Sequence, residues 1–81
     1  LSVEFSPDSQ FVASGSYDTN VKIWSVDKGA LIRSFQAHSD AVNCVAFSPD
    51  GNYLATASSD ATIKVWDLKT GTLYRHFEGH T

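Results

Sequence analysis

The sequence contains no methionine and a single cysteine, Cys44, among its 81 residues. One cysteine excludes a disulfide bond within the chain and favours a reducing compartment. The chain also opens inside a strand-like run, Leu1-Ser2-Val3-Glu4-Phe5, without an initiating methionine. We therefore expect it to be a piece of a longer protein.

Positive charge is scarce, with six Lys and Arg against nine Asp and Glu and a net charge of −3. The basic residues are scattered along the chain, which argues against a nucleic-acid groove. They are Lys22, Lys28, Arg33, Lys64, Lys69 and Arg75. No apolar run approaches the roughly 18 residues that a membrane span needs. We expect neither nucleic acid nor a membrane among the partners.

What the sequence does contain is a repeat with a period of 42 residues. Residues 1–39 and 43–81 align without a gap and share 15 identical positions. The turn Phe5-Ser6-Pro7-Asp8 returns as Phe47-Ser48-Pro49-Asp50, and the other matches include Asp18 with Asp60, Lys22 with Lys64, Trp24 with Trp66, Gly29 with Gly71 and His38 with His80. A fixed period of this length indicates a repeat architecture.

Each repeat contains four runs of strand length, separated by Pro, Gly and Asx turn residues. We expect strands at 1–5, 11–15, 21–25 and 30–35, and again at 41–47, 53–57, 62–66 and 72–77. In the run 41–47, Val42, Cys44 and Ala46 are expected on one face and Val45 and Phe47 on the other. Two apolar faces favour an inner strand covered on both sides. The more polar fourth run suits an exposed edge, and nothing predicts a helix.

The period, His38 before the second repeat and the Trp66-Asp67 pair that closes its third strand make the chain resemble the WD-repeat family of β-propellers. Ala37 replaces the Gly expected before the histidine, and Ser25 replaces the Asp expected after Trp24. The resemblance implies an all-β fold of two four-stranded antiparallel blades, residues 1–36 and 37–81. A propeller has about four to eight blades, so we expect the remaining ones from the same chain or from other copies.

The resemblance also implies a buried structural tetrad in each blade. In it the Trp66 indole N–H donates to Thr56, the Thr56 hydroxyl donates to His38, and the second His38 nitrogen bonds Asp60. The matching positions are Ser14, Asp18 and Trp24 in the first blade, while His80 is expected to serve a third blade. The alternative is a catalytic hydroxyl, imidazole and carboxylate triad, which needs an open pocket and an oxyanion site.

The other residues that suggest chemistry are few. His76 and His80 stand four apart, as in zinc sites, but no Cys pair completes a tetrahedron. We expect no metal and no cofactor, and we expect Cys44 to pack as a small hydrophobe.

Binding is the leading class of function, because a propeller presents loops on a rigid ring. The resemblance implies an intracellular scaffold, cytoplasmic or nuclear, that binds protein partners and is not itself an enzyme. The alternatives are a regulatory or targeting arm of an enzyme whose catalytic domain lies elsewhere, and a purely structural sector of a large assembly. The candidate contact residues are those expected at exposed loop positions: Tyr17, Ser59, Asn43, Ala41 and Leu1.

Overall fold

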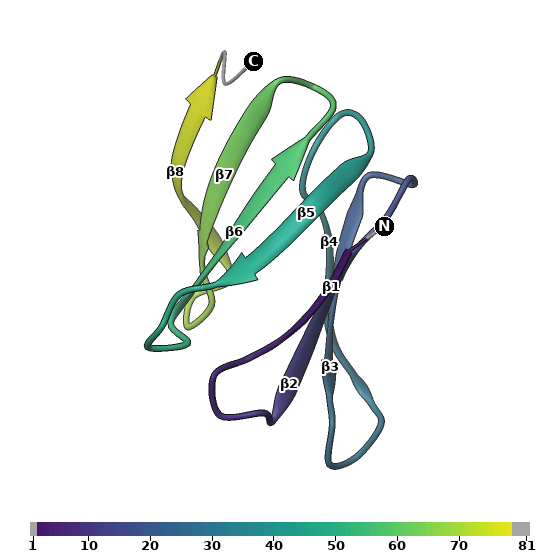
Figure 1. Cartoon of the computed structure of the whole chain (residues 1–81), viewed down its shortest axis with the longest axis vertical. Coiled ribbons are helices and arrows are strands. Elements are labelled where there is room, and N and C mark those ends of the chain that lie inside the picture. Colours follow the sequence, from purple (N-terminus) through teal and green to yellow (C-terminus); the bar gives the residue numbers. More distant parts are fainter. Residues whose placement is uncertain (1, 79–81) are drawn as a thin grey trace.

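The computed structural model describes residues 2–78, which form eight β-strands (Figure 1). The first four are β1 (Ser2–Phe5), β2 (Phe11–Gly15), β3 (Asn20–Ser25) and β4 (Leu31–Gln36). The second four are β5 (Val42–Phe47), β6 (Tyr53–Ser58), β7 (Thr62–Asp67) and β8 (Thr72–Glu78). This part of the chain has no helix long and apolar enough to cross a membrane.

The strands form two separate antiparallel sheets, in the orders β1-β2-β3-β4 and β5-β6-β7-β8. Within each sheet every strand pairs with its neighbour in sequence, because the connecting turns are short. The first turn is closed by the same side-chain bonds in both sheets. Asp8 Oδ1 accepts the Ser6 hydroxyl at 2.6 Å and the Gln10 amide at 3.0 Å, which closes the β1–β2 turn. Asp50 repeats both bonds one period later, with Ser48 and Asn52. The repeated turn therefore produces a repeated hairpin.

The two sheets pack face to face, and β5 lies beside β1 (Figure 1). Apolar side chains of β2 and β3 meet those of β5 and β6, and the core consists of Ala13, Val21, Ile23, Ala37, Val42, Val45 and Leu54. Two hydrogen bonds cross directly between the first strands: the Val45 amide donates to Ser2 Oγ at 3.3 Å, and the Phe47 amide donates to Glu4 Oε1 at 3.0 Å. Burial and these bonds join the sheets into one unit.

A bulge in β5 corrects the expected facing of that strand. Its register with β6 shifts between Val42 and Cys44, so one extra residue enters the strand there. Val42 and Val45 are both buried against the first sheet, whereas Cys44 and Ala46 are exposed. The prediction that Val42 and Cys44 share a face was therefore wrong, because an inserted residue reverses the alternation. Cys44 is also not packed in the core of residues 2–78.

The outward faces of the pair remain apolar. On the first sheet Val3 is 68% exposed and Phe5 60%, and on the second Phe77 is 52% exposed. The fourth strand of the second sheet, β8, is exposed along its whole length, as its polar sequence predicted. The predicted strand positions agree with the observed ones to within one residue at each described end. Position 1, the predicted start of the first strand, lies outside the described residues.

Candidate functional site

The loop between β4 and β5 carries His38 into the interior, where the side chain is almost completely buried. The Ala37 and His38 amides both donate to the Thr19 carbonyl, at 3.1 and 3.4 Å. The loop is thereby attached to the β2–β3 turn of the first sheet, while its histidine points into the second. His38 thus links the two sheets, through its backbone amide to the first and through its imidazole to the second.

Four predicted tetrad residues meet around this imidazole. His38 Nε2 lies 2.8 Å from Thr56 Oγ1, and His38 Nδ1 lies 3.1 Å from Asp60 Oδ2. The Trp66 indole N–H donates to Thr56 Oγ1 at 3.1 Å. The ionised Asp60 accepts the proton of Nδ1, so Nε2 accepts the proton of the Thr56 hydroxyl. Each polar atom then has a partner, and none of the described buried side-chain N or O atoms lacks one.

Two further residues complete the carboxylate's surroundings and were not predicted. The Thr62 hydroxyl donates to Asp60 Oδ1 and lies 2.9 Å from His38 Nδ1. The Thr62 amide donates to Oδ1 at 2.9 Å and the Ser39 amide to Oδ2 at 3.1 Å. The signal for Thr62 was the Asx turn, in which Asp bonds the amide two residues later. Nothing in the sequence marks Ser39.

These surroundings lower the pKa of both groups, which favours the neutral form of His38 and the ionised form of Asp60. Burial lowers the pKa of His38 and outweighs the hydrogen bond and charge of Asp60, which raise it. Burial on its own raises the pKa of Asp60, but the bonds from Thr62, Ser39 and His38 outweigh it and hold that pKa far below its ordinary value. At neutral pH the site therefore holds a neutral imidazole beside an ionised carboxylate.

The hydroxyl of this cluster is not accessible to a substrate. Thr56 is 1% exposed and His38 2%, and the indole of Trp66 packs at 4.7 Å between ring centroids against Phe35 of the first sheet. Nucleophilic catalysis requires an approach to the hydroxyl and donors for an oxyanion. The arrangement is suited to joining strands and the inter-sheet loop rather than to chemistry.

Lys64 adds a second tie to the same loop and was also not identified beforehand. Its Nζ donates to the Ala37 carbonyl at 2.8 Å and lies 6.0 Å from the centre of the Trp66 ring. The available signal was its identity with Lys22 one period earlier. A charged residue retained at a strand position between apolar neighbours indicates a specific acceptor.

The predicted tetrad positions of the first sheet, in contrast, have no histidine partner among residues 2–78. Trp24 and Ser14 are half-buried, and Asp18 is exposed. The Asn20 amide donates to Asp18 Oδ1 at 3.0 Å, and this bond together with Ser16 lowers the pKa of Asp18. The predicted partner role of His80 falls on a residue outside the described part.

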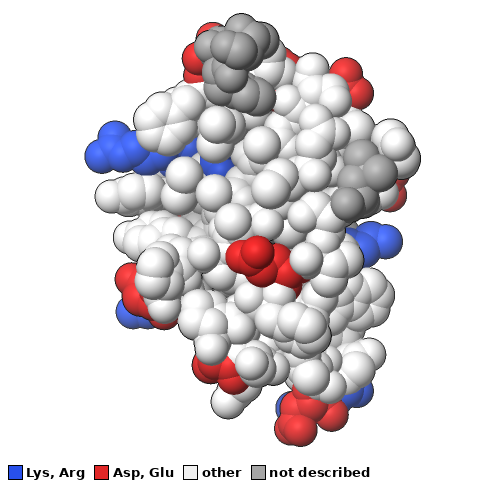
Figure 2. Space-filling view, in the orientation of Figure 1, with Lys and Arg blue, Asp and Glu red and all other residues white. Residues whose placement is uncertain are grey.

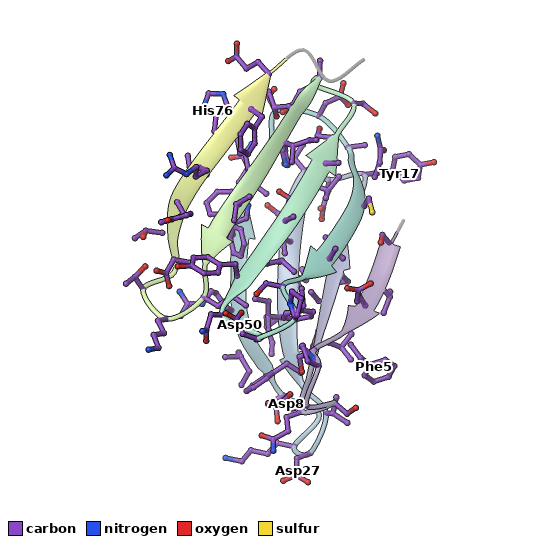
Figure 3. The ribbon with its side chains drawn as sticks, turned by 60° about the vertical axis from the view of Figure 1, so that its left-hand side comes forward. Phe5, Asp8, Tyr17, Asp27, Asp50 and His76 are labelled. Atoms are coloured by element: carbon purple, nitrogen blue, oxygen red, sulfur yellow. The ribbon has the colours of Figure 1, made fainter. Side chains whose placement is uncertain are left out.

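The predicted contact residues lie along one edge of the molecule, which we call the Tyr17 edge: the β2–β3 turn, the β6–β7 turn and the start of β5. Tyr17 is 75% exposed and projects from this edge (Figure 3). Asn43 and Ser59 are also exposed, and Asn43 Nδ2 donates to Ser59 Oγ at 3.0 Å. Ala41 was expected to be exposed but is buried, in the segment whose carbonyl accepts the Ser59 amide at 3.1 Å. Leu1 lies outside the described residues.

Charge does not gather on the face seen in Figure 2, where Lys and Arg lie apart from one another near the periphery. Within residues 2–78 no group of three or more His, Cys, Asp or Glu side chains is placed to hold a metal ion. His76, one member of the considered zinc pair, lies 3.0 Å from Glu78 through its Nε2. The other member, His80, is not described.

Comparison with known families and proteins adds sequence relatives. The family model described as "WD domain, G-beta repeat" matches residues 1–25 and 29–67. The chain is 54% identical over 37 residues to the nuclear distribution protein PAC1 of Zygosaccharomyces rouxii, covering 46% of this chain and 8% of that protein. It is 48% identical over 42 residues to the methylosome protein WDR77 of Xenopus laevis, covering 52% and 12%. The chain thus spans a small part of these relatives.

A solved structure extends the likeness over the whole chain. The β-propeller domain of Cps50 (Swd1) from Myceliophteria thermophila is similar with a TM-score of 0.94 at 30% sequence identity. The match covers 100% of this chain and 26% of that one. The two sheets therefore correspond to about a quarter of the Cps50 chain.

Proposed function

Because the chain belongs to the WD-repeat family and folds as two four-stranded antiparallel blades of a β-propeller, we propose that its Tyr17 edge docks a protein partner. The family typically provides non-catalytic scaffolds for protein interactions. The observation that carries the proposal is Tyr17 itself, an aromatic side chain left 75% exposed at a turn. Exposed tyrosines supply large contact area at low entropic cost and are frequent hot spots of interfaces.

The neighbours of Tyr17 suit a docking rim. Asn43 and Ser59 lie on the same Tyr17 edge, and both expose a polar side chain, an amide and a hydroxyl. A central aromatic anchor with a polar rim is the usual composition of such an interface. The Ser16 carbonyl accepts the Val42 amide at 2.9 Å, which holds the turn of Tyr17 against the second blade. The anchor is therefore carried on a fixed support.

We also propose that the His38 cluster is the structural tetrad of the second blade, that the blades comprise residues 1–36 and 37–81, and that further blades cover their outward faces. The apolar faces that carry Phe5 and Phe77 support the last point. The names of the relatives, which refer to nuclear distribution and the methylosome, support an intracellular location, cytoplasmic or nuclear.

The docking proposal is tested by placing a photo-crosslinking phenylalanine analogue at position 17 of the protein and identifying the crosslinked partner. The same analogue at position 74, another exposed tyrosine on β8, is the positional control. The affinity of the identified partner is then measured for Tyr17→Ala and Tyr74→Ala. We expect at least a tenfold loss for Tyr17→Ala only. Equal affinities for both variants and the unaltered protein would overturn the proposal.

A further inference from the structure

A cavity of about 290 Å³ lies between the two blades, at the end that carries the β1–β2 and β5–β6 turns. Asp8 and Asp50 mark this end in Figure 3, and Tyr17 lies at the opposite one. Two other hollows of the surface are each lined by a single sheet. This cavity differs because both of its walls come from described strands and turns, so its shape does not depend on another blade.

Apolar side chains contribute the larger share of the cavity walls. Phe11, Ile23 and Ile32 line it from the first sheet, and Phe47 and Leu68 line it from the second. Ile32 remains 53% exposed although it borders this hollow. Filling the space with an apolar side chain would remove that surface from water, which is favourable at about 25 cal/mol per Å².

One charged group in the lining has no acceptor. Arg33 is half-buried, lines the cavity and forms no hydrogen bond or ion pair with any of residues 2–78. Its guanidinium lies against Gly71, where any side chain would overlap the Nη1 atom. Glycine at this turn therefore leaves the space that the guanidinium occupies. A guanidinium is a planar donor suited to a carboxylate.

The two acidic residues in the lining accept hydrogen bonds from residues of their own turns. Asp8 and Asp50 each hold Oδ1 against a serine hydroxyl and a backbone amide. The Asn52 side chain also interacts with the Asp50 carboxylate, whereas Asp8 Oδ2 accepts no hydrogen bond from residues 2–78. Asp8 therefore suits a backbone N–H group of a ligand, and Arg33 suits its anionic group.

The second blade carries larger side chains at the positions that correspond to two of these lining residues. One period after Phe11 and Ile32 stand Tyr53 and Tyr74, whose rings lie 5.0 Å apart. The first blade has the smaller Ile32 where the second has a tyrosine. Tyr53 and Tyr74 line a separate hollow on the second sheet alone. A tyrosine at position 32 would lie between the two blades, where its larger side chain is expected to take up part of the cavity.

We propose that this cavity is a docking pocket for a segment of another protein in which a large apolar side chain adjoins a carboxylate. The apolar side chain enters between Phe11, Ile32 and Leu68, and the carboxylate pairs with Arg33. The pocket is distinct from the Tyr17 edge, so one blade pair can hold two partners or two parts of one partner.

The test uses the ¹⁵N-labelled chain and two small probes that differ in one group, N-acetyl-L-phenylalanine and its uncharged carboxamide. We expect the acid to shift the amide signals around positions 11, 32, 33, 47 and 68 with a Kd on the order of 1 mM. The carboxamide should bind about tenfold more weakly. Ile32→Tyr should abolish both shifts, and Arg33→Gln should remove the preference for the acid.

Arg75→Gln is the matched control, because Arg75 stands one period after Arg33 and lies over the Tyr74 ring instead of in the cavity. It should leave both probes unaffected. The Trp66 indole signal reports folding of every variant, and Arg33→Lys serves where Arg33→Gln is not folded. Equal binding of the two probes, unchanged binding to Ile32→Tyr, or shifts located elsewhere would each overturn the proposal. Tyr17→Ala should leave probe binding intact, which separates this site from the docking edge.

Discussion

At the scale of single residues, the Thr56 hydroxyl is the atom on which the buried cluster depends. It accepts the Trp66 indole N–H and bonds His38 Nε2, with no exposure to water that could replace either bond. Removing it leaves a buried donor and a buried acceptor unpaired. Each such group costs about 1–3 kcal/mol in proteins, more than most single surface changes.

We therefore predict that Thr56→Val, which preserves the shape of the side chain, lowers the free energy of unfolding by about 2–3 kcal/mol. Urea unfolding followed by tryptophan fluorescence measures the change. Thr70→Val is the matched control, because Thr70 pairs only with exposed groups near β8; it should stay within about 0.5 kcal/mol of the unaltered chain. A Thr56→Val protein as stable as the control would contradict the proposed role of the cluster.

The same cluster predicts a dependence of stability on pH. The His38 pKa is lowered in the folded chain from its ordinary 6.5, so between those two values the unfolded state binds more protons. Stability is then present above about pH 6.5 and is lost as the pH falls from there to the folded pKa. Asp60, whose pKa is lowered from 3.8, adds a second loss below that value.

Urea midpoints measured between pH 8 and pH 3 should therefore fall in two steps on acidification. His38→Gln should flatten the first step and retain the second, even where its overall stability is lower. A midpoint that stays constant or rises between pH 7.5 and 5.5 would show that the imidazole is not held neutral.

At the scale of elements, the packing of β2 on β5 explains why the two repeats differ at one aligned position. Gly15 in β2 corresponds to Ala57 in β6. A Cβ atom at Gly15 would lie 2.7 Å from Val42 Cγ1, closer than carbon atoms can approach. Ala57 stands on the outward face of its sheet and meets no such neighbour within residues 2–78.

We predict that Gly15→Ala lowers the free energy of unfolding by about 1–3 kcal/mol, because it forces β5 away from the first blade. The reciprocal change Ala57→Gly should cost about 1 kcal/mol through the backbone entropy of a strand. Urea unfolding compares the two variants. Gly15→Ala without a loss of stability would mean that the blades are not in the contact described.

At the scale of the whole molecule, the two blades leave apolar surface on both outward faces. Val3, Phe5 and Phe77 are each more than half exposed, and repeat units usually bury such faces against neighbours. We predict that the 81-residue chain self-associates, with a weight-average mass above its 8.8 kDa that rises over a tenfold range of concentration.

Static light scattering measures this mass. Phe5→Thr, on the outward face of β1, should reduce the association. Tyr17→Ser, which removes a still more exposed aromatic from a turn, should leave it unchanged. A mass of 8.8 kDa at every concentration would show that the outward faces do not bind other copies.

The 42-residue repeat predicted more of the molecule than any other feature. Local patterns determined the hairpins, because turns such as Ser6 to Ser9 are closed by bonds between near neighbours. The resemblance assigned His38, Thr56, Asp60 and Trp66 to one cluster, and the structure brings them within hydrogen-bond distance. Thr62 was missed although its bonds to Asp60 lie within one turn, whereas Ser39 was missed because its bond to Asp60 depends on how the loop and the turn meet.

The sequence by itself determined the strand positions and the repeated turns, because these depend on spacing along the chain, and its resemblance to the WD-repeat family implied the four-residue cluster. Only the tertiary structure decided which residues the other blade covers. The bulge in β5 exposed Cys44, Ala41 became buried at the start of the second blade, and the approach of two sheets created the cavity beside Arg33. Contacts between units depend on their relative placement in space, which no local pattern of residues specifies.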